Sequence, residues 1–204
     1  GPFLIENNIL LSDLSIRDWS EGGAYVHNLI AGNIELRPQS RLTPYQKPHS
    51  TKLAWLQKTL GGDNRFFNNI FVADAEENNN QKPGLKVYEN SEHPMFVNGN
   101  VYLGNAHPFS IEKNQLVLDY SPEIQLEENG DEIFLAFNFD NQILKMKNQL
   151  VTTELLGKAK IPEQKYENPD GSPLVIDNDF FGNSRNKNNP THGPFEKPGT
   201  GKIM

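Results

Sequence analysis

Carboxylates beside turn residues are the first feature of this sequence that could do chemistry. Glu21 follows Asp18-Trp19-Ser20 and precedes Gly22-Gly23, so it lies in a turn where the backbone can approach a ligand closely. Hydrolysis of a glycosidic bond needs two carboxyl groups beside the scissile bond, and further groups that hold the sugar. Glu21 is therefore a candidate substrate-binding residue. The alternative is that its carboxylate hydrogen-bonds the backbone of a tight corner.

A second group of polar residues precedes an aliphatic segment. Asp63 and Arg65 are two residues apart, and on an extended backbone their side chains point the same way. Such a pair could grip sugar hydroxyls, or it could be a structural ion pair. Tyr45 and His49 lie in a long segment, 35–62, and could line the same sugar pocket. All four are kept as candidate substrate-binding residues.

Several other kinds of chemistry find no support in the sequence. The chain has no Cys, which excludes disulfides, thiolate metal sites and cysteine nucleophiles. The remaining His residues are too scattered to suggest a metal site, so neither a metal nor a cofactor is expected. The net charge is -7 and no basic run occurs, so nucleic acid is not an expected partner. No apolar run is long enough to cross a membrane, so no membrane partner is expected.

A repeat indicates which elements position the candidate residues. An Asn followed by an aliphatic segment occurs at Asn8, Asn28, Asn69 and Asn100, at intervals of 20, 41 and 31 residues. The shortest interval is typical of one supersecondary unit, and the longer ones suggest the same unit with inserted loops. Asn tolerates the left-handed corner between strands, and stacked Asn side chains can hydrogen-bond along a column. The pattern predicts an all-β right-handed parallel β-helix, with a β-sandwich as the alternative.

The predicted coils occupy residues 1–108, with inserted loops at 35–62 and 74–93. After residue 108 the pattern changes to terminal coils or antiparallel capping strands over 109–204, with an extended arm at 186–201. A hairpin-like turn is expected at Glu128-Asn129-Gly130-Asp131. The strands expected in this part are Gln115–Asp119, Glu123–Leu126, Glu132–Phe139 and Gln149–Leu155.

Five phrases carry a family resemblance that covers nearly the whole chain. In order they are Gly1-Pro2-Phe3-Leu4-Ile5-Glu6-Asn7-Asn8-Ile9-Leu10-Leu11-Ser12, Ser20-Glu21-Gly22-Gly23-Ala24-Tyr25-Val26-His27-Asn28-Leu29, Thr43-Pro44-Tyr45 with His49-Ser50-Thr51, Gly62-Asp63-Asn64-Arg65-Phe66-Phe67-Asn68-Asn69-Ile70-Phe71 and Asn168-Pro169-Asp170-Gly171-Ser172-Pro173. Together they resemble the C-terminal part of the β-helix xylosidases of glycoside hydrolase family 120. The last phrase is shared more widely among β-helix carbohydrate enzymes.

The resemblance implies a retaining mechanism with an Asp nucleophile and a Glu acid/base, their carboxyl groups ~5–5.5 Å apart. In the family pattern both precede the phrase that opens this chain, so neither role transfers to a residue here. What the resemblance implies for Glu21, Tyr45, His49, Asp63 and Arg65 is a place in the wall of the active site. The expected partners are then an oligosaccharide and the remainder of the parent polypeptide, with a homo-oligomer also considered. The chain alone is expected to be inactive.

Three functions stay open on the sequence. The first is the C-terminal portion of a retaining β-xylosidase acting on xylo-oligosaccharides. The second is a polysaccharide lyase on the same fold, which would need a cationic groove that a net charge of -7 argues against. The third is a non-catalytic carbohydrate-binding coil protein, which the missing carboxylate pair fits equally well. The compartment is unknown, with a periplasmic or secreted location favoured over the cytoplasm.

Overall fold

The computed structural model describes residues 2–47, 49–73, 82–199 and 201–203. Regular structure in these residues is almost entirely β, which confirms the predicted all-β class. The helical elements among them are short: α1 (Asn141–Lys145), α2 (Thr153–Leu156) and one 3-10 turn, η1 (Lys86–Tyr88). No helix in the described part of the chain is long and apolar enough to cross a membrane.

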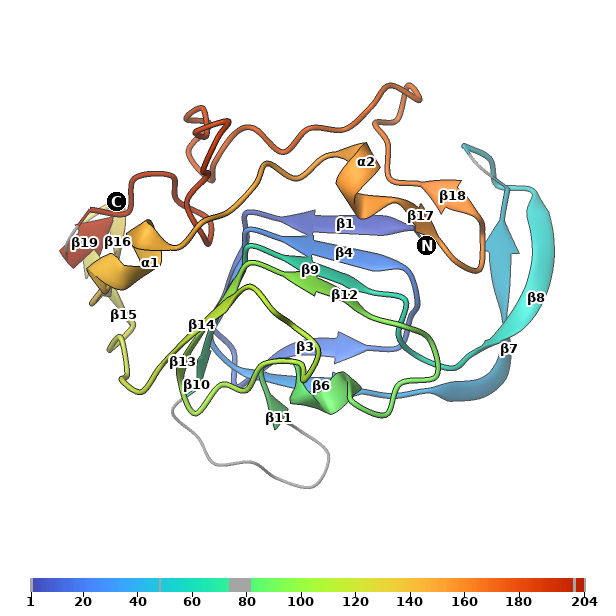
Figure 1. The fold of residues 1–204 in the computed structure, drawn as a ribbon, viewed down its shortest axis with the longest axis horizontal. Helices are drawn as coiled ribbons and strands as arrows, with labels where there is room; N and C mark the ends of the chain where they lie inside the picture. The colour runs from blue at the N-terminus through green and yellow to red at the C-terminus, as the bar shows by residue number, and fades with distance from the viewer. Residues whose placement is uncertain (1, 48, 74–81, 200, 204) are drawn as a thin grey trace.

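Three sheets form the faces of the body of the molecule and surround its interior (Figure 1). The first sheet is all parallel, in the order β1 (Phe3–Glu6), β4 (Gly23–Val26), β9 (Arg65–Phe67) and β12 (Phe96–Asn98). The second is also parallel, in the order β14 (Gln115–Leu118), β13 (Asn100–Gly104), β10 (Ile70–Ala73), β5 (Leu29–Ile30) and β2 (Ile9–Leu10). The third joins β3 (Leu14–Asp18) to β6 (Asn33–Leu36) in parallel, with β11 (Lys82–Pro83) antiparallel on the far edge. Each pass of the chain through these sheets is one coil.

The predicted Asn column lies at the corner between the first two sheets. Oδ1 of Asn28 accepts hydrogen bonds from the backbone N–H and Nδ2 of Asn8, at 2.9 and 3.3 Å. Asn69 accepts the same pair from Asn28, and Asn100 accepts it from Asn69, all at 2.9–3.0 Å. Glu112 ends the column, because its Oε1 accepts both bonds from Asn100. The repeat in the sequence is thus a continuous line of hydrogen bonds across the coils.

The left-handed corner conformation lies one residue earlier than the column. Asn7, His27 and Asn68 have φ values of 56°, 55° and 60°, and Gly99 takes the same place with 73°. These residues turn the backbone from the first sheet into the second, where Asn and Gly bear little steric cost. The doubled Asn therefore has two functions: the first residue makes the turn and the second makes the column.

Aromatic rings of successive coils stack inside the bore. Tyr25 lies on Phe66 with ring centres 4.5 Å apart and planes 3° apart, and Phe71 lies on Tyr102 at 5.1 Å and 8°. Parallel pairing in register places each ring above its counterpart, as in Tyr25↔Phe66. The outer face of the first sheet is also covered, by an apolar cluster that includes Val151, Leu156 and Tyr166. Strands buried on both faces explain the nearly continuous apolar segments in the sequence.

The segment expected as an inserted loop at 35–62 contains an antiparallel hairpin. Its strands are β7 (Gln39–Gln46) and β8 (Leu53–Thr59), and Figure 1 shows them at one end of the molecule. Of the other expected loop, at 74–93, residues 74–81 lie outside the described residues.

One of the strands expected after residue 108 belongs to the terminal coils and another is corrected by the structure. Strand β14, in the expected segment Gln115–Asp119, pairs in parallel with β13, because Leu116 and Leu118 continue the apolar face of the second sheet. Gln149–Leu155 is not a strand. Thr152 caps helix α2 there by accepting a hydrogen bond from the Leu155 N–H, a local signal that outweighs the β-propensity of the segment.

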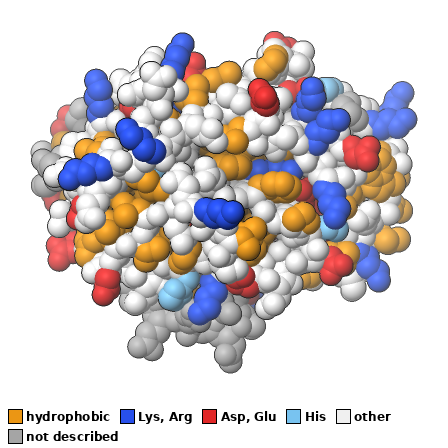
Figure 2. Space-filling view, in the orientation of Figure 1, with side chains coloured by type: hydrophobic (Ala, Val, Ile, Leu, Met, Phe, Trp, Pro, Cys, Tyr) orange, Lys and Arg blue, Asp and Glu red, His pale blue; other side chains and the backbone are white. Residues whose placement is uncertain are grey.

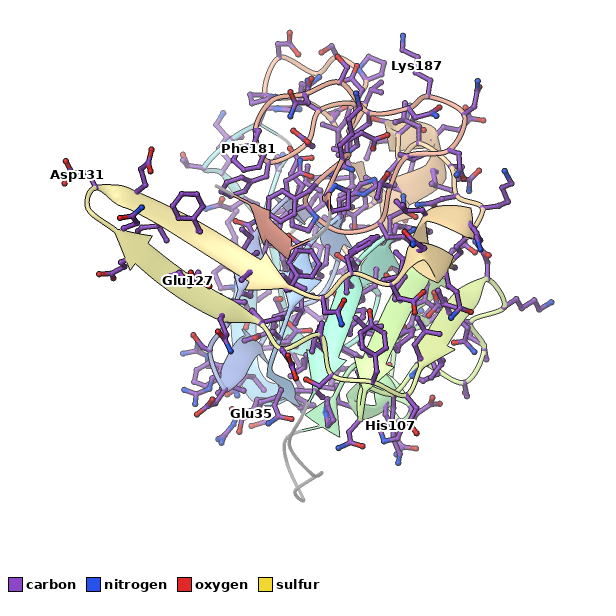
Figure 3. All side chains as sticks on the ribbon, turned by 90° about the vertical axis from the view of Figure 1, so that its left-hand side faces the viewer. Glu35, His107, Glu127, Asp131, Phe181 and Lys187 are labelled. Carbon is purple, nitrogen blue, oxygen red and sulfur yellow. The ribbon has the colours of Figure 1, made fainter. Side chains whose placement is uncertain are left out.

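The expected antiparallel layer and its turn are present. β15 (Gln125–Asn129) and β16 (Glu132–Phe137) form a hairpin around residues 130–131, and β19 (Gly201–Ile203) pairs with the other edge of β16. Figure 3 shows this hairpin projecting away from the coils. A further small pair, β17 (Lys158–Ala159) and β18 (Gln164–Lys165), lies in the segment that covers the first sheet.

The expected C-terminal arm packs on the column corner through buried polar contacts. The N–H of Gly193 donates to the carbonyl of Asn68, and Nη2 of Arg185 donates to Oδ1 of Asn7 at 2.6 Å. His27 of the coils and His192 of the arm are both buried, and neither ring nitrogen of His192 has a hydrogen-bond partner among the described residues. Burial, and the nearby Arg185 guanidinium, lower the pKa of His192 to about 4 and hold that of His27 well below its usual value.

This buried histidine pair predicts a loss of stability in mild acid. In the unfolded chain the His192 side chain binds a proton below pH ~6.5, whereas in the folded protein its pKa is lowered to about 4. The free energy of unfolding is therefore fully retained above pH ~6.5. At pH 5, protonation of His192 in the unfolded chain should lower it by about 2 kcal/mol. Urea unfolding at pH 7.5 and pH 5 measures this difference. His192→Leu should flatten the pH dependence, and an unchanged pH slope in that variant would contradict the assignment.

Candidate functional site

A cavity of about 650 Å³ opens beside β1, the edge strand of the first sheet. Pro2, Phe3 and Leu4 form its floor. One wall is His49, from the segment that connects β7 to β8, and the other wall is the covering segment 158–174. The side chains that bring charge to the second wall are Lys158, Glu163, Lys165 and Glu167. The cavity thus combines an apolar floor with walls that carry both signs of charge.

One exposed polar contact joins the two walls of the cavity. Nε2 of His49 lies 2.8 Å from Oε1 of Glu167, with 47% and 27% of the two side chains exposed. Gln164 adds a longer bond across the same gap, from its Nε2 to the carbonyl of Gln46 at 3.4 Å. Both partners of the His49–Glu167 pair can reach a bound molecule, because both line the cavity and both are open to solvent.

Glu21 and Tyr45 lie behind the first wall, at the base of the hairpin. Oε1 of Glu21 accepts from the backbone N–H groups of Leu60 and Gly61, and its Oε2 accepts from the Tyr45 hydroxyl at 2.7 Å. Burial, together with the adjacent carboxylate of Glu21, raises the pKa of Tyr45, so the phenol stays protonated and donates. Glu21 is only 2% exposed. It therefore fixes both strands of the hairpin to the coil.

Asp63 and Arg65 lie behind the second wall and form a buried ion pair. Nη1 of Arg65 is 2.6 Å from Oδ1 of Asp63, and the two side chains are 2% and 1% exposed. Oδ2 of Asp63 accepts from the Lys160 N–H at 2.6 Å. Arg65 donates to the carbonyls of Leu156 and Lys158. The pair thus fastens the start of the covering segment to the coil.

Aromatic rings complete the surroundings of Arg65. Its guanidinium carbon lies 4.3 Å from the ring centre of Phe96 and 5.1 Å from that of Tyr166. The Tyr166 hydroxyl donates to the carbonyl of Gly22 at 2.9 Å, next to Glu21. These contacts therefore connect the Asp63–Arg65 pair behind the second wall to the Glu21 turn behind the first wall.

All five residues singled out in the sequence belong to this one corner of the molecule. His49 alone among them lines the cavity. The polar groups of Glu21, Tyr45, Asp63 and Arg65 are paired with other protein groups, which corresponds to the alternatives considered for Glu21 and for the Asp63–Arg65 pair. These four side chains support the walls of the cavity, and their contact with a substrate stays a prediction.

No sequence pattern singles out Glu163 or Glu167. Glu167 directly precedes the turn phrase that begins at Asn168, and only this neighbourhood could have drawn attention to it. The described residues contain no cluster of three His, Asp or Glu side chains that could hold a metal ion.

Comparison with known proteins gives one informative similarity. No protein-family model and no curated protein matches the chain. Among solved structures, that of XylC in complex with xylose is similar over 100% of this chain, with a TM-score of 0.92 and 32% sequence identity. The chain spans 35% of the length of the XylC chain.

Proposed function

We propose that this chain is the C-terminal portion of a retaining β-xylosidase acting on xylo-oligosaccharides, and that it forms the wall of the sugar pocket. The observation that carries the proposal is the similarity of the whole chain to one third of XylC, a protein solved with xylose bound. The stacked coils are, in this proposal, the last coils of a right-handed parallel β-helix. The nucleophile and the acid/base belong to coils that precede Phe3.

The unpaired edge of the coils supports this placement. β1, β2 and β3 each have a strand partner on one side only, and all three belong to the same coil. Oδ1 of Asn8, the first member of the column, accepts no hydrogen bond from the described residues, whereas Oδ1 of Asn28 accepts two. A preceding coil that pairs with β1 would continue the column. Its residues would lie directly at the mouth of the cavity.

The lining of the cavity suits a neutral sugar. Lys158 and Lys165 are balanced by Glu163 and Glu167, so the pocket is not the cationic groove that a uronate-cleaving lyase needs. The exposed His49–Glu167 pair offers a donor and an acceptor to sugar hydroxyls. Phe3 and Leu4 supply an apolar surface for the ring face. Direct contact with substrate is therefore proposed for His49 and Glu167.

The test uses the parent polypeptide and an aryl-β-xyloside. The parent should release nitrophenol, and Glu167→Gln or His49→Gln should lower kcat/KM about 10- to 100-fold, the size expected for a lost charge-assisted hydrogen bond. Glu154→Gln is the matched control, because Glu154 is an exposed carboxylate near the covering segment that does not line the cavity. It should leave kcat/KM unchanged.

Two outcomes would count against the proposal. Release of nitrophenol by residues 1–204 alone would show that the catalytic carboxylates lie within this chain. Tight binding of xylobiose by the parent with no hydrolysis would favour the non-catalytic carbohydrate-binding alternative.

A further inference from the structure

Two Asn-Gly dipeptides occur in the chain, Asn98-Gly99 and Asn129-Gly130. Asn is a chemically labile residue, because the backbone nitrogen of the following residue can attack its side-chain amide carbon. Gly hinders that attack least, since it has no Cβ. The fold gives the two dipeptides opposite surroundings, so their reactivity should differ.

Asn129-Gly130 lies at the tip of the β15–β16 hairpin. Asn129 and Glu132 are the last pair in the register of the two strands, so residues 130–131 alone make the turn. Gly130 has a φ of 64°, and nothing lies within 4 Å of the place where a Cβ would stand. Asn129 and Gly130 are both exposed, and Figure 3 shows the tip, marked by Asp131, standing clear of the coils. Water and base therefore reach this dipeptide freely.

The attacking nitrogen at this tip is not held by the fold. The Gly130 N–H donates no hydrogen bond to any group of the described residues. For the attack, Asn129 has to leave its extended conformation, and only its pairing with Glu132 must open for that. The last pair of a hairpin opens at a small cost in free energy, as fraying ends do.

Asn98-Gly99 is held on every side, in contrast. The Gly99 N–H donates to the carbonyl of Asn114 at 2.7 Å, and the carbonyl of Asn98 accepts from the Asn68 N–H at 3.2 Å. A Cβ on Gly99 would lie 2.5 Å from Oδ1 of Asn68 and 3.0 Å from Oδ1 of Asn148, so the corner is closely packed. Attack at Asn98 therefore requires the coils to open beside the Asn column.

We propose that Asn129 is a site of spontaneous deamidation and that the fold protects Asn98 from the same reaction. The Gly130 nitrogen forms a bond to Cγ of Asn129, the bond from Cγ to Nδ2 breaks, and the displaced proton leaves with Nδ2 as ammonia. The product is a five-membered succinimide ring. Water then opens the ring at one of its two carbonyl carbons, which gives aspartate or isoaspartate. Water is the only co-reactant, and nothing is oxidised or reduced.

Either product adds a negative charge to a tip that is already acidic. The carboxylates within six residues of the chain there are Glu127, Glu128, Asp131 and Glu132. Figure 2 shows acidic side chains at the surface of the end of the molecule where Figure 1 places this hairpin. Like charges on one hairpin repel each other, so the new carboxylate weakens the pairing of the strands at the tip.

The isoaspartate product also changes the backbone itself. It carries the main chain through the former side chain and so adds one methylene group next to a turn of two residues. Asn129 and Glu132 then cannot keep their register. The pairing of Leu126 with Leu135 is nearer the coils, and Leu135 is buried there, so this part of the hairpin stays intact.

Peptide mapping by mass spectrometry tests the proposal in one sample. The folded protein is kept in mildly alkaline buffer, and conversion is followed at both Asn-Gly dipeptides. Asn129 should convert at least about 100-fold faster than Asn98, a ratio that corresponds to about 2.7 kcal/mol. In urea that unfolds the chain, the two sites should convert at similar rates, because the protection of Asn98 belongs to the fold.

Asn129→Gln is the matched control, because the longer side chain would have to close a six-membered ring. Position 129 should then stay unmodified, and hydrogen exchange of the backbone amides at the tip should not change with time. In the unmodified chain this exchange should become faster as Asn129 converts. Equal rates at Asn98 and Asn129 in the folded protein would overturn the proposal. An intact Asn129 in the folded protein, under conditions that convert it in the unfolded chain, would overturn it as well.

Discussion

Arg65→Met is expected to lower the free energy of unfolding by about 3–5 kcal/mol, because it leaves a buried charge without its partner. Asp63 is 1% exposed at its side chain, and Arg65 is its partner in the ion pair. The variant also removes the donors to the carbonyls of Leu156 and Lys158. Unfolding in urea, followed by circular dichroism, measures the change.

Arg17→Met is the matched control for this prediction. Arg17 also pairs with a carboxylate, that of Glu35, at 2.8 Å, but its side chain is 54% exposed. The Glu35 side chain is only 4% exposed, but it keeps Arg37 as a second partner when Arg17 is removed, and Arg17 itself is open to solvent. This variant should therefore change stability by no more than about 1 kcal/mol. A comparable loss in both variants would show that burial of the Asp63–Arg65 pair is not what matters.

Removing the partner charge should restore part of the lost stability. In the double variant Asp63→Asn with Arg65→Met no buried charge is left, and Asn tolerates the left-handed conformation of residue 63, where φ is 56°. We expect the double variant to be more stable than Arg65→Met alone. In the parent polypeptide, Arg65→Met should also lower kcat while the protein is still folded, because the second wall of the cavity is no longer fixed to the coil.

Features of the fold could be predicted from the sequence where they depend on contacts that recur in every coil or that join residues close together in the chain. The Asn column could be predicted because the same residue type recurs at the same corner of each coil. The shared direction of Asp63 and Arg65 could be predicted from their spacing on an extended backbone. The turn of the β15–β16 hairpin could be predicted from Asn129-Gly130.

The walls of the cavity could not be predicted, because they depend on contacts between distant residues. Arg65 reaches Leu156 across 91 positions and Lys158 across 93, and Asp63 reaches Lys160 across 97. A single sequence carries no information on which distant segment covers which strand. For the same reason the contact between His49 and Glu167, which are 118 positions apart, could not be predicted from the sequence.

The exact position of the left-handed corner was missed for a local reason. Asn is favoured both in that conformation and in a hydrogen-bonded column, so a doubled Asn does not reveal which residue does which. Gly99 in front of Asn100 is the informative copy, since Gly can make the turn but cannot contribute a side chain to the column.

Asn69→Leu should be the most damaging change in the column, at about 3–5 kcal/mol, since each unpaired buried polar group costs about 1–3 kcal/mol. Oδ1 of Asn69 accepts from the N–H and Nδ2 of Asn28, and its Nδ2 donates to the Tyr25 carbonyl and to Asn100. Leu has nearly the same size but offers none of these bonds. The variant therefore leaves buried polar groups of Asn28, Tyr25 and Asn100, on the neighbouring coils, without the hydrogen bonds that Asn69 makes to them.

Asn8→Leu provides the comparison, because it removes the same side chain at the open end of the column. Asn8 is exposed, and its side chain makes bonds only to Glu6 and Asn28 among the described residues. Water can replace those bonds, so the cost should stay below about 1 kcal/mol. Both variants can be compared by urea unfolding under one condition. Similar small losses would mean that the column is a by-product of strand pairing. A large loss at Asn69 alone would show that the repeated Asn stabilises the stack, and that its contribution depends on a coil being present on both sides.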